Sequence, residues 1–198
     1  MRVLLIGVGT VGESIARLAA AHPWCEAMVL ADYDTARAES LQASLGDRER
    51  FAVAHIDARD SEAVAALARR HRSDLVMNAV DPQFVMPIFE GALEAGTHYM
   101  DMAASLSVPH PTHPFTTPGL KLGDLQFARH EDWEQSGRLA LVGMGMDPGL
   151  SDVFARHARD HLFDEVRPSC PGTAFIGGLS RWSRASTSPP DGSHRGSA

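Results

Sequence analysis

The sequence predicts an α/β fold, built as a doubly wound parallel sheet of about six strands with helices on both faces. Two observations predict it. Apolar runs of strand length alternate along the chain with segments whose apolar residues recur at helical spacing. A glycine-rich turn also follows the first apolar run directly and opens the first helical segment. Because neighbouring parallel strands need a crossover, and crossovers are right-handed, this order distributes the helices over both faces of the sheet.

The expected elements alternate over the first 166 residues. Strands are expected at residues 2–7, 26–32, 51–57, 74–80, 97–102 and 138–143. Helices are expected at residues 10–22, 34–46, 60–71 and 82–94. Asp34 is expected to cap the second helix, because an Asp side chain accepts hydrogen bonds from the free amides of a first turn. Gly46 and Gly96 are expected to end the helices before them.

Composition and charge narrow the classes of partner. With 198 residues, 44% of them hydrophobic, the chain can bury one substantial core. Its net charge of -7 argues against nucleic acid and anionic membranes, which both attract basic surfaces. The first apolar run is too short for a signal peptide or a membrane span, and the two cysteines form no metal-spaced pair. We therefore expect a cytoplasmic protein that acts on a small molecule and holds no metal; a homodimer stays open.

The composition changes after Val166, which divides the expected organisation in two. Residues 1–166 hold 14 Arg and Lys against 24 Asp and Glu, whereas residues 167–198 hold four Arg and one Asp. Ser, Gly and Pro make up 16 of those last 32 residues, and no apolar period can be traced among them. We expect residues 1–166 to form a nucleotide-binding domain and residues 167–198 to form a low-complexity, disordered tail.

The glycine-rich turn carries the strongest chemical signal. Its glycines have the GxGxxG spacing of a Rossmann-type dinucleotide-binding fold and lie between a strand and a helix. Gly7 permits the tight turn, Gly9 lets the backbone approach a pyrophosphate, and Gly12 allows close packing of helix and strand. Thr10 and Val11 supply free N–H groups at the helix N-terminus, where an anion is stabilised.

An acidic residue completes this fingerprint. Asp32 ends the second strand 20 residues after Gly12, where its carboxylate can accept hydrogen bonds from an adenosine ribose. A carboxylate there pairs with a 2′-hydroxyl and repels a 2′-phosphate, so NAD is favoured over NADP. Arg37 tempers this preference, because it lies five residues on and could reach a phosphate. The alternative for Arg37 is an ordinary solvated charge.

Other strand ends complete the set of candidate cofactor contacts. Ligands bind at the carboxyl ends of strands in open parallel sheets. Residues after the third strand are expected to border the adenine, and those after the fourth to line the path toward the nicotinamide. Either group could equally serve as strand-ending caps. The candidates beyond the glycine turn and Asp32 are Tyr33, Asp57, Ala58, Asn78, Ala79 and Val80.

These segments together resemble a known family. "MRVLLIGVGTVGESIARLAA", "LADYD", "LVMNAVDPQF", "THYMDMA" and "GMDPGLSDVFARH", in this order, are similar to the saccharopine dehydrogenase family over about residues 1–166. The resemblance implies a nucleotide domain followed by an α/β substrate domain. It also implies hydride transfer between a nicotinamide and a carbon–nitrogen bond of an amino acid or polyamine-type substrate. The particular substrate does not transfer with the resemblance.

Two acidic residues are the catalytic candidates, Asp101 at the carboxyl end of the fifth strand and Asp147 at that of the sixth. A carboxylate at either place could steer a cationic amine or relay a proton. The structural alternative is strong for both. Asp147 in particular is expected to cap a helix that begins at Pro148.

The chain departs from the family pattern after Val166, where a substrate domain would follow. A frameshift or truncated gene and a natural short form both stay open as explanations of this break. We expect an intact nucleotide site with weak or absent turnover, because nothing then holds a substrate near the nicotinamide. A non-catalytic NAD(P)-binding sensor or interaction module is the alternative function, since the fold alone does not separate the two.

Overall fold

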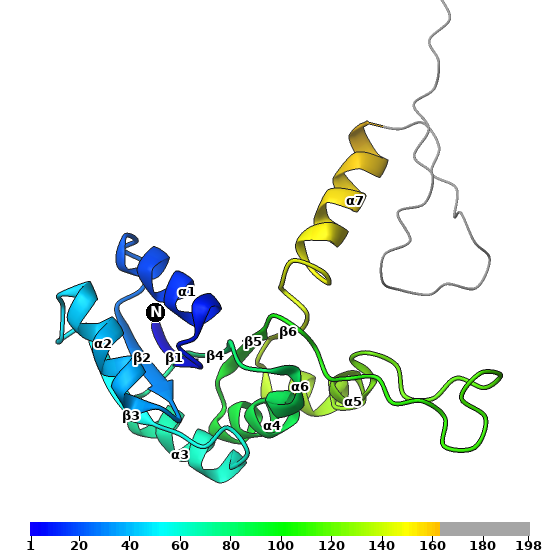
Figure 1. Ribbon diagram of the computed structural model, residues 1–198, viewed down its shortest axis with the longest axis horizontal. Helices are drawn as coiled ribbons and strands as arrows, with labels where there is room; N and C mark the ends of the chain where they lie inside the picture. Colours follow the sequence, from blue (N-terminus) through cyan, green and yellow to red (C-terminus); the bar gives the residue numbers. More distant parts are fainter. Residues whose placement is uncertain (163–198) are drawn as a thin grey trace, which may run out of the picture. The chain divides into compact units, whose positions relative to one another are not determined.

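The computed structural model describes residues 1–162 (Figure 1). Residues Met1–Gly149 form one compact unit around a six-stranded sheet. All strands are parallel, in the order β3-β2-β1-β4-β5-β6, which confirms the predicted doubly wound fold. The strands are β1 Arg2–Ile6, β2 Ala27–Asp32, β3 Phe51–His55, β4 Leu75–Asn78, β5 His98–Asp101 and β6 Ala140–Leu141.

Helices cover both faces of the sheet, as Figure 1 shows. One face packs Ala16 and Leu41, from α1 and α2, against β1 and β2. The other packs Val64 and Phe89, from α3 and α4, against the same strands and β4. Each helix buries its apolar stripe on the sheet, which removes both layers of side chains from water. The helices are α1 Thr10–Ala20, α2 Thr35–Leu45, α3 Ser61–Arg70, η1 Pro82–Phe84, α4 Val85–Ala95, α5 Asp124–Phe127, α6 His130–Ser136 and α7 Leu150–His161.

The expected caps of α2 and α4 agree with the structure, whereas several expected helix bounds shift. The helix expected at 10–22 ends at Ala20, and the one expected at 82–94 begins as the 3-10 helix η1 before α4. The Asp34 side chain accepts a hydrogen bond from the Ala36 N–H (3.1 Å), and Gly46 ends α2 at a φ of 75°. Gly96 ends α4 in the same left-handed conformation. The expectation that a helix begins at Pro148 is wrong, because α7 begins at Leu150. The predicted strand 138–143 also shortens to the two residues of β6.

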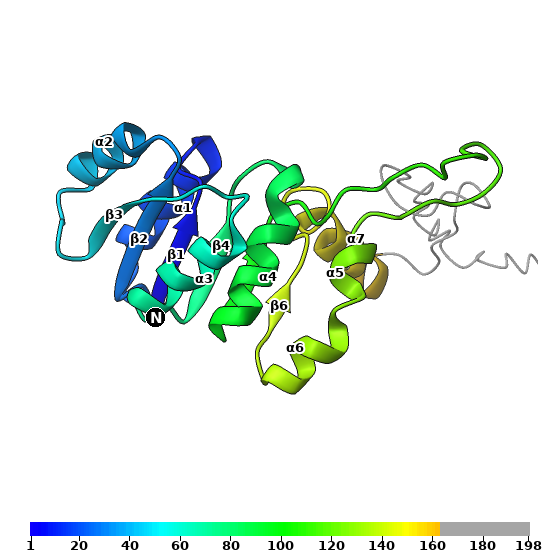
Figure 2. The same cartoon turned by 90° about the horizontal axis from the view of Figure 1, so that it is seen from below.

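The segment between β5 and β6 contains two short helices that the sequence pattern does not predict. It contains α5 and α6, both shorter than the length at which a helical period can be recognised. Before them a long arm runs outward and returns, as Figure 2 shows. Val108 and Leu120 form an antiparallel bridge between its two limbs, and Phe115 in its outer part is 99% exposed.

The helix α7 belongs to a second unit, which begins at Leu150. None of its residues is buried. The predicted boundary at residue 167 and the predicted tail lie outside the described residues. Within residues 1–162 no helix combines the length and the apolar character needed to cross a membrane.

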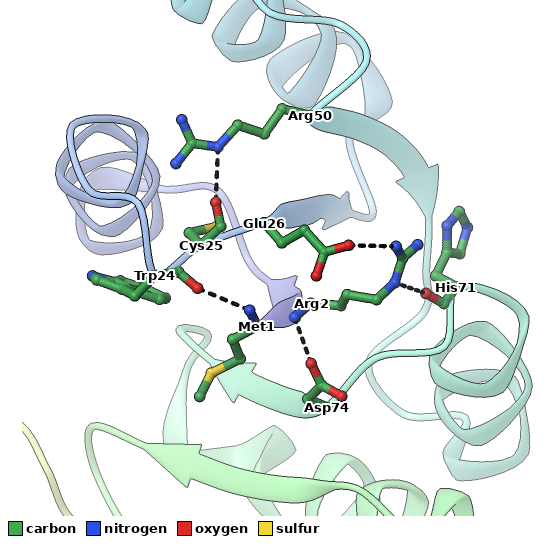
Figure 3. A network of polar contacts seen from close by, with 8 residues as sticks. All are labelled: Met1, Arg2, Trp24, Cys25, Glu26, Arg50, His71 and Asp74. Carbon is green, nitrogen blue, oxygen red and sulfur yellow. Dashed lines mark hydrogen bonds and ion pairs between the residues drawn. The ribbon is translucent and has the colours of Figure 1, made fainter.

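At the amino-terminal end of the sheet, charged groups form hydrogen bonds with backbone N–H and carbonyl groups (Figure 3). The Arg50 guanidinium donates to the carbonyls of Cys25 (3.0 Å), Ala20 (2.9 Å), Ala19 (2.8 Å) and His22 (2.8 Å). Ala19 and Ala20 are the last two residues of α1, where carbonyls run out of helical partners, and His22 and Cys25 belong to the segment that follows the helix. Arg50 therefore joins the end of α1 to the start of β3.

At the same end of the sheet, Met1 and Arg2 form hydrogen bonds with the segments that precede β2 and β4 (Figure 3). The Arg2 N–H donates to the Asp74 carboxylate (2.7 Å), and the Arg2 Nε donates to the His71 carbonyl (3.0 Å). The amino group of Met1 donates to the Trp24 carbonyl (2.9 Å). The polar groups at this end of the sheet thus serve the fold.

Replacing Arg50 by Lys tests this role. A lysine keeps the charge but has three donors on one atom and cannot span the four carbonyls. We expect the free energy of unfolding in urea to fall by about 2 kcal/mol, because hydrogen bonds from a charged donor are lost. Replacing the exposed Arg48 by Lys is the matched control and should leave stability unchanged. Equal urea midpoints for the two variants would contradict the assignment.

Candidate functional site

The glycine turn between β1 and α1 is too tight to hold a side chain at Gly7 or Gly12. Gly7 has a φ of 92°, and its N–H donates to the Ala31 carbonyl (2.8 Å). A Cβ on Gly7 would lie 2.5 Å from Val80 Cγ1, and one on Gly12 would overlap the carbonyl oxygen of Gly7. Glycine is therefore required at both positions for the turn to close.

The middle glycine of the turn, Gly9, faces open space. Gly9 precedes α1, and a Cβ built on it would meet no atom within 4 Å. The first helical hydrogen bond runs from the Glu13 N–H to the Gly9 carbonyl (2.8 Å). The N–H groups of Thr10, Val11 and Gly12 thus come before the helical ladder begins, where a helix N-terminus stabilises an anion.

A cleft of about 240 Å³ lies beside this turn, at the carboxyl ends of β1 to β4. Six of the predicted contacts line it: Gly7, Asp32, Tyr33, Asp57, Ala58 and Val80. Four other lining residues were not predicted: Ile6, Ile56, Arg59 and Phe84. Three of these four are apolar, which suits the flat face of a nucleobase better than a purely polar site would.

The carboxylate of Asp32 is largely engaged with the backbone. Its Oδ2 accepts a hydrogen bond from the Val8 N–H (2.8 Å), and its Oδ1 accepts one from the Asp34 N–H (2.9 Å). The residue is 9% exposed. The Arg37 Nη1 lies 3.9 Å from its Oδ2. Asp32 thus ties the glycine turn to the end of β2, a contact that the sequence analysis did not foresee.

An ion pair borders the cleft after β3. Arg59 Nη2 lies 2.7 Å from Asp57 Oδ2, and Arg59 Nε donates to Asp57 Oδ1 (2.9 Å). The Arg59 side chain, hydrogen-bonded to it, lowers the pKa of the Asp57 carboxyl to about 2. Tyr33 is 70% exposed nearby, and its ring centroid lies 5.4 Å from that of His55. A cation and an aromatic ring are thus available at the rim of the cleft.

The end of β4 is held from beneath by buried side chains. The Asn78 Oδ1 accepts a hydrogen bond from the Val80 N–H (3.1 Å), and the Asn78 Nδ2 donates to the Tyr99 hydroxyl (3.1 Å). The hydroxyl in turn donates to Asp101 Oδ2 (2.9 Å). Burial, and next the charge of Asp101, raise the pKa of Tyr99 well above its usual value. The phenol therefore keeps its proton.

Neither predicted catalytic carboxylate lines the cleft. Asp101 is 1% exposed and lies beneath the surface. Asp147 is exposed on the turn that follows β6. Within residues 1–162 no three His, Cys, Asp or Glu side chains gather as metal ligands would.

Fold and site together define a class of protein. A glycine turn after β1, the strand order β3-β2-β1-β4-β5-β6 and a cleft at the carboxyl ends are the features of a dinucleotide-binding Rossmann domain. Residues 3–141 match the family model of the saccharopine dehydrogenase NADP binding domain. The chain belongs to that family, which confirms the resemblance seen in the sequence.

Curated relatives are longer than this chain. A carboxyaminopropylagmatine dehydrogenase of Synechocystis sp. is 28% identical over 167 residues, which cover 83% of this chain and 39% of the relative. A carboxynorspermidine synthase of Vibrio alginolyticus is 29% identical over 174 residues, which cover 84% and 41% of the two chains. The chain thus spans about two fifths of the length of these relatives.

A solved structure supports the fold. The apo saccharopine dehydrogenase (L-Glu forming) of Saccharomyces cerevisiae superposes with a TM-score of 0.61 at 19% identity, covering 81% of this chain and 31% of the yeast protein. At this identity the likeness concerns the fold alone.

The Asp57–Arg59 pair gives a measurable titration. A carboxyl whose pKa is lowered by folding stabilises the folded state above its ordinary pKa, and this contribution is lost as the pH falls through the lowered value. With a pKa of about 2, the Asp57 carboxyl carbon should show almost no NMR shift change between about pH 6 and about pH 3.5.

In the Arg59→Gln variant, the backbone N–H of residue 59 still donates to Asp57 but the guanidinium is gone, so the pKa should rise from about 2 toward 3.8 and the same carbon should show a larger shift change within that range. Arg70→Gln, which removes an exposed arginine from α3, is the control and should leave the curve as in the wild type. Identical curves for wild type and Arg59→Gln would refute the ion pair.

Proposed function

We propose that the chain binds NAD(P), with the adenosine half in the cleft and the pyrophosphate above Gly9. The observation that carries the proposal is the closed glycine turn with open space at Gly9 beside a partly apolar cleft. The N–H groups of Thr10 and Val11 would bind the pyrophosphate oxygens. Tyr33 and Ala58 would border the adenine, and Asn78, Ala79 and Val80 would form the inner wall of the site.

We further propose that this domain serves an oxidoreductase acting at a carbon–nitrogen bond of an amine substrate. Family membership supports the reaction class, and the two curated relatives are named for carboxylated polyamine-type compounds. The nicotinamide, when bound, supplies or accepts the hydride. This chain's own residues would bind and orient the dinucleotide, and positioning of that kind contributes strongly to rate. The substrate and the activity of the whole protein are part of the proposal.

The form of the dinucleotide is a finer proposal. The carboxylates of Asp32 and Asp57 line the cleft and support NAD, because they repel a 2′-phosphate. The guanidinium of Arg37 and the family's description as NADP-binding support NADP. The Asp32 carboxylate already serves two backbone amides, which reduces what it offers to a ribose hydroxyl. We keep NAD as the proposed form, and a direct comparison of the two dissociation constants decides it.

Replacing Gly9 by Ala tests the placement of the pyrophosphate. The φ of -69° suits alanine, and the added methyl group would meet no protein atom. Its unfolding free energy should thus stay within about 1 kcal/mol of wild type. In the proposed complex the methyl group occupies the space of the pyrophosphate. We expect the dissociation constants for NAD and NADP, measured by calorimetry, to rise by roughly tenfold or more, about 1.4 kcal/mol.

Ser14→Ala is the control, because it changes an exposed side chain one turn further along α1. It should bind both dinucleotides like the wild type. The proposal fails if the wild type binds neither dinucleotide, or if Gly9→Ala binds as tightly as Ser14→Ala. A smaller dissociation constant for NADP than for NAD in the wild type would overturn the proposed cofactor form alone.

A further inference from the structure

A chain of buried hydrogen bonds connects the wall of the cofactor cleft to the segments that follow β5. Its side chains come from β4, β5 and α5, and each is at most 2% exposed: Asn78, Tyr99, Asp101 and Gln126. We call this group the Asp101 network. Buried polar groups are costly unless they are satisfied, so such a network fixes one arrangement of its members.

The carboxylate of Asp101 is the acceptor at the centre of the network. Its Oδ1 accepts hydrogen bonds from the Gly143 N–H (2.6 Å) and the Ala104 N–H (3.1 Å). Its Oδ2 accepts them from the Tyr99 hydroxyl (2.9 Å) and the Gln126 Nε2 (2.7 Å). Four donors meet the lone-pair positions of an ionised carboxylate, which can only accept. Asp101 is therefore engaged on all sides and acts through its neighbours.

The direction of each hydrogen bond follows from this acceptor. Because Asp101 only accepts, the Tyr99 hydroxyl gives its single proton to Asp101, and its oxygen must accept from the next group. That group is the Asn78 Nδ2, at 3.1 Å. With its amide nitrogen directed to Tyr99, Asn78 has its Oδ1 toward the Val80 N–H, from which it accepts at 3.1 Å. The proton of Tyr99 thus sets the orientation of the Asn78 amide.

The turn that Asn78 holds is the wall against which the glycine turn packs. A Cβ on Gly7 would lie 2.5 Å from Val80 Cγ1 and 2.8 Å from the Ala79 carbonyl oxygen. Gly7 and Val80 both line the cleft. A small displacement of Val80 therefore moves the glycine turn or changes the width of the cleft.

The far side of the network fixes two further segments. The Gln126 Oε1 accepts a hydrogen bond from the Ser105 N–H (2.7 Å), which ties α5 to the turn after β5. In that turn Ala104 has a φ of 60°, a left-handed conformation that alanine seldom adopts. Its N–H is one of the four donors to Asp101, so the carboxylate holds the unfavourable conformation in place.

We propose that Tyr99 and Asp101 are positioning residues for the dinucleotide, and that they act by fixing the Asn78–Val80 turn against the glycine turn. This inference rests on the proposed function, because it assumes that the cleft holds NAD(P). It assigns Asp101 a role without contact to substrate or cofactor, in place of proton transfer. It also gives Tyr99 a function that its burial alone does not reveal.

The test compares two variants that each remove one buried hydroxyl, that of Tyr99 in β5 and that of Thr97 directly before β5. Tyr99→Phe keeps the shape of the ring and removes the hydroxyl, whose oxygen accepts from the Asn78 Nδ2 and whose proton is donated to Asp101. Thr97→Val is the matched control, because the Thr97 hydroxyl donates to the Ala92 carbonyl (3.2 Å) at the amino-terminal side of β5 and is 4% exposed as a residue. Dissociation constants for NAD and NADP are measured by calorimetry well below both melting temperatures. Amide exchange at Val80 is measured without ligand.

We expect Tyr99→Phe to raise the dissociation constants by roughly three- to tenfold, because the variant loses one hydrogen bond that holds the Asn78–Val80 turn. The Val80 amide should exchange faster in this variant than in wild type. Thr97→Val should match the wild type in affinity and in Val80 exchange, whatever its melting temperature. A merely structural role would lower both melting temperatures and leave affinity unchanged.

Two results overturn the inference in distinguishable ways. If the wild type and Thr97→Val bind NAD(P) and Tyr99→Phe binds equally well, the positioning role is refuted while the proposed function stands. If the wild type binds neither dinucleotide, the proposed function fails and the inference fails with it.

Discussion

The central place of β1 in the sheet is the constraint on which the site depends. Because β1 pairs with β2 on one side and β4 on the other, the chain leaves β1 and β4 in different directions and a crevice remains between them. The glycine turn lies at this point and closes against the Ala79–Val80 wall. The cleft, its apolar lining residues and the start of α1 all take their positions from that reversal of strand order.

Two buried carboxylates use this geometry in the same way. Asp32 binds the N–H groups of Val8 and Asp34, and Asp101 binds those of Ala104 and Gly143. Each stands at the carboxyl end of its strand, where the regular ladder stops and backbone groups need new partners. In this domain an acidic residue at a strand end thus holds nearby loops through hydrogen bonds, besides being a candidate contact for a cofactor. At the opposite end of the strands, Arg2 and Arg50 fasten the backbone from the donor side.

Much of this arrangement could be predicted from the sequence, because it depends on local pattern. The strand and helix periods, the GxGxxG spacing and the Asp34 cap are all readable within a few residues, and they led to the correct fold and the cleft around Gly7 and Asp32. The role of Asp101 could not be read this way, since its donors come from residues 99 to 143 along the chain. Gln126 was missed because α5 spans only Asp124–Phe127 and shows no apolar period. Arg59 lines the cleft from the turn after β3 and Phe84 lines it from η1, and no local pattern marks either side chain as a cleft residue.

In the proposed complex the dinucleotide lies at the carboxyl ends of the strands, beside the glycine turn. Amide chemical-shift mapping during titration with NAD or NADP tests this placement most directly. We expect the largest changes at the amides of Gly9, Val11, Tyr33, Ala58 and Val80. Changes centred on Arg2, His71 and Asp74, at the other end of the strands, would contradict it.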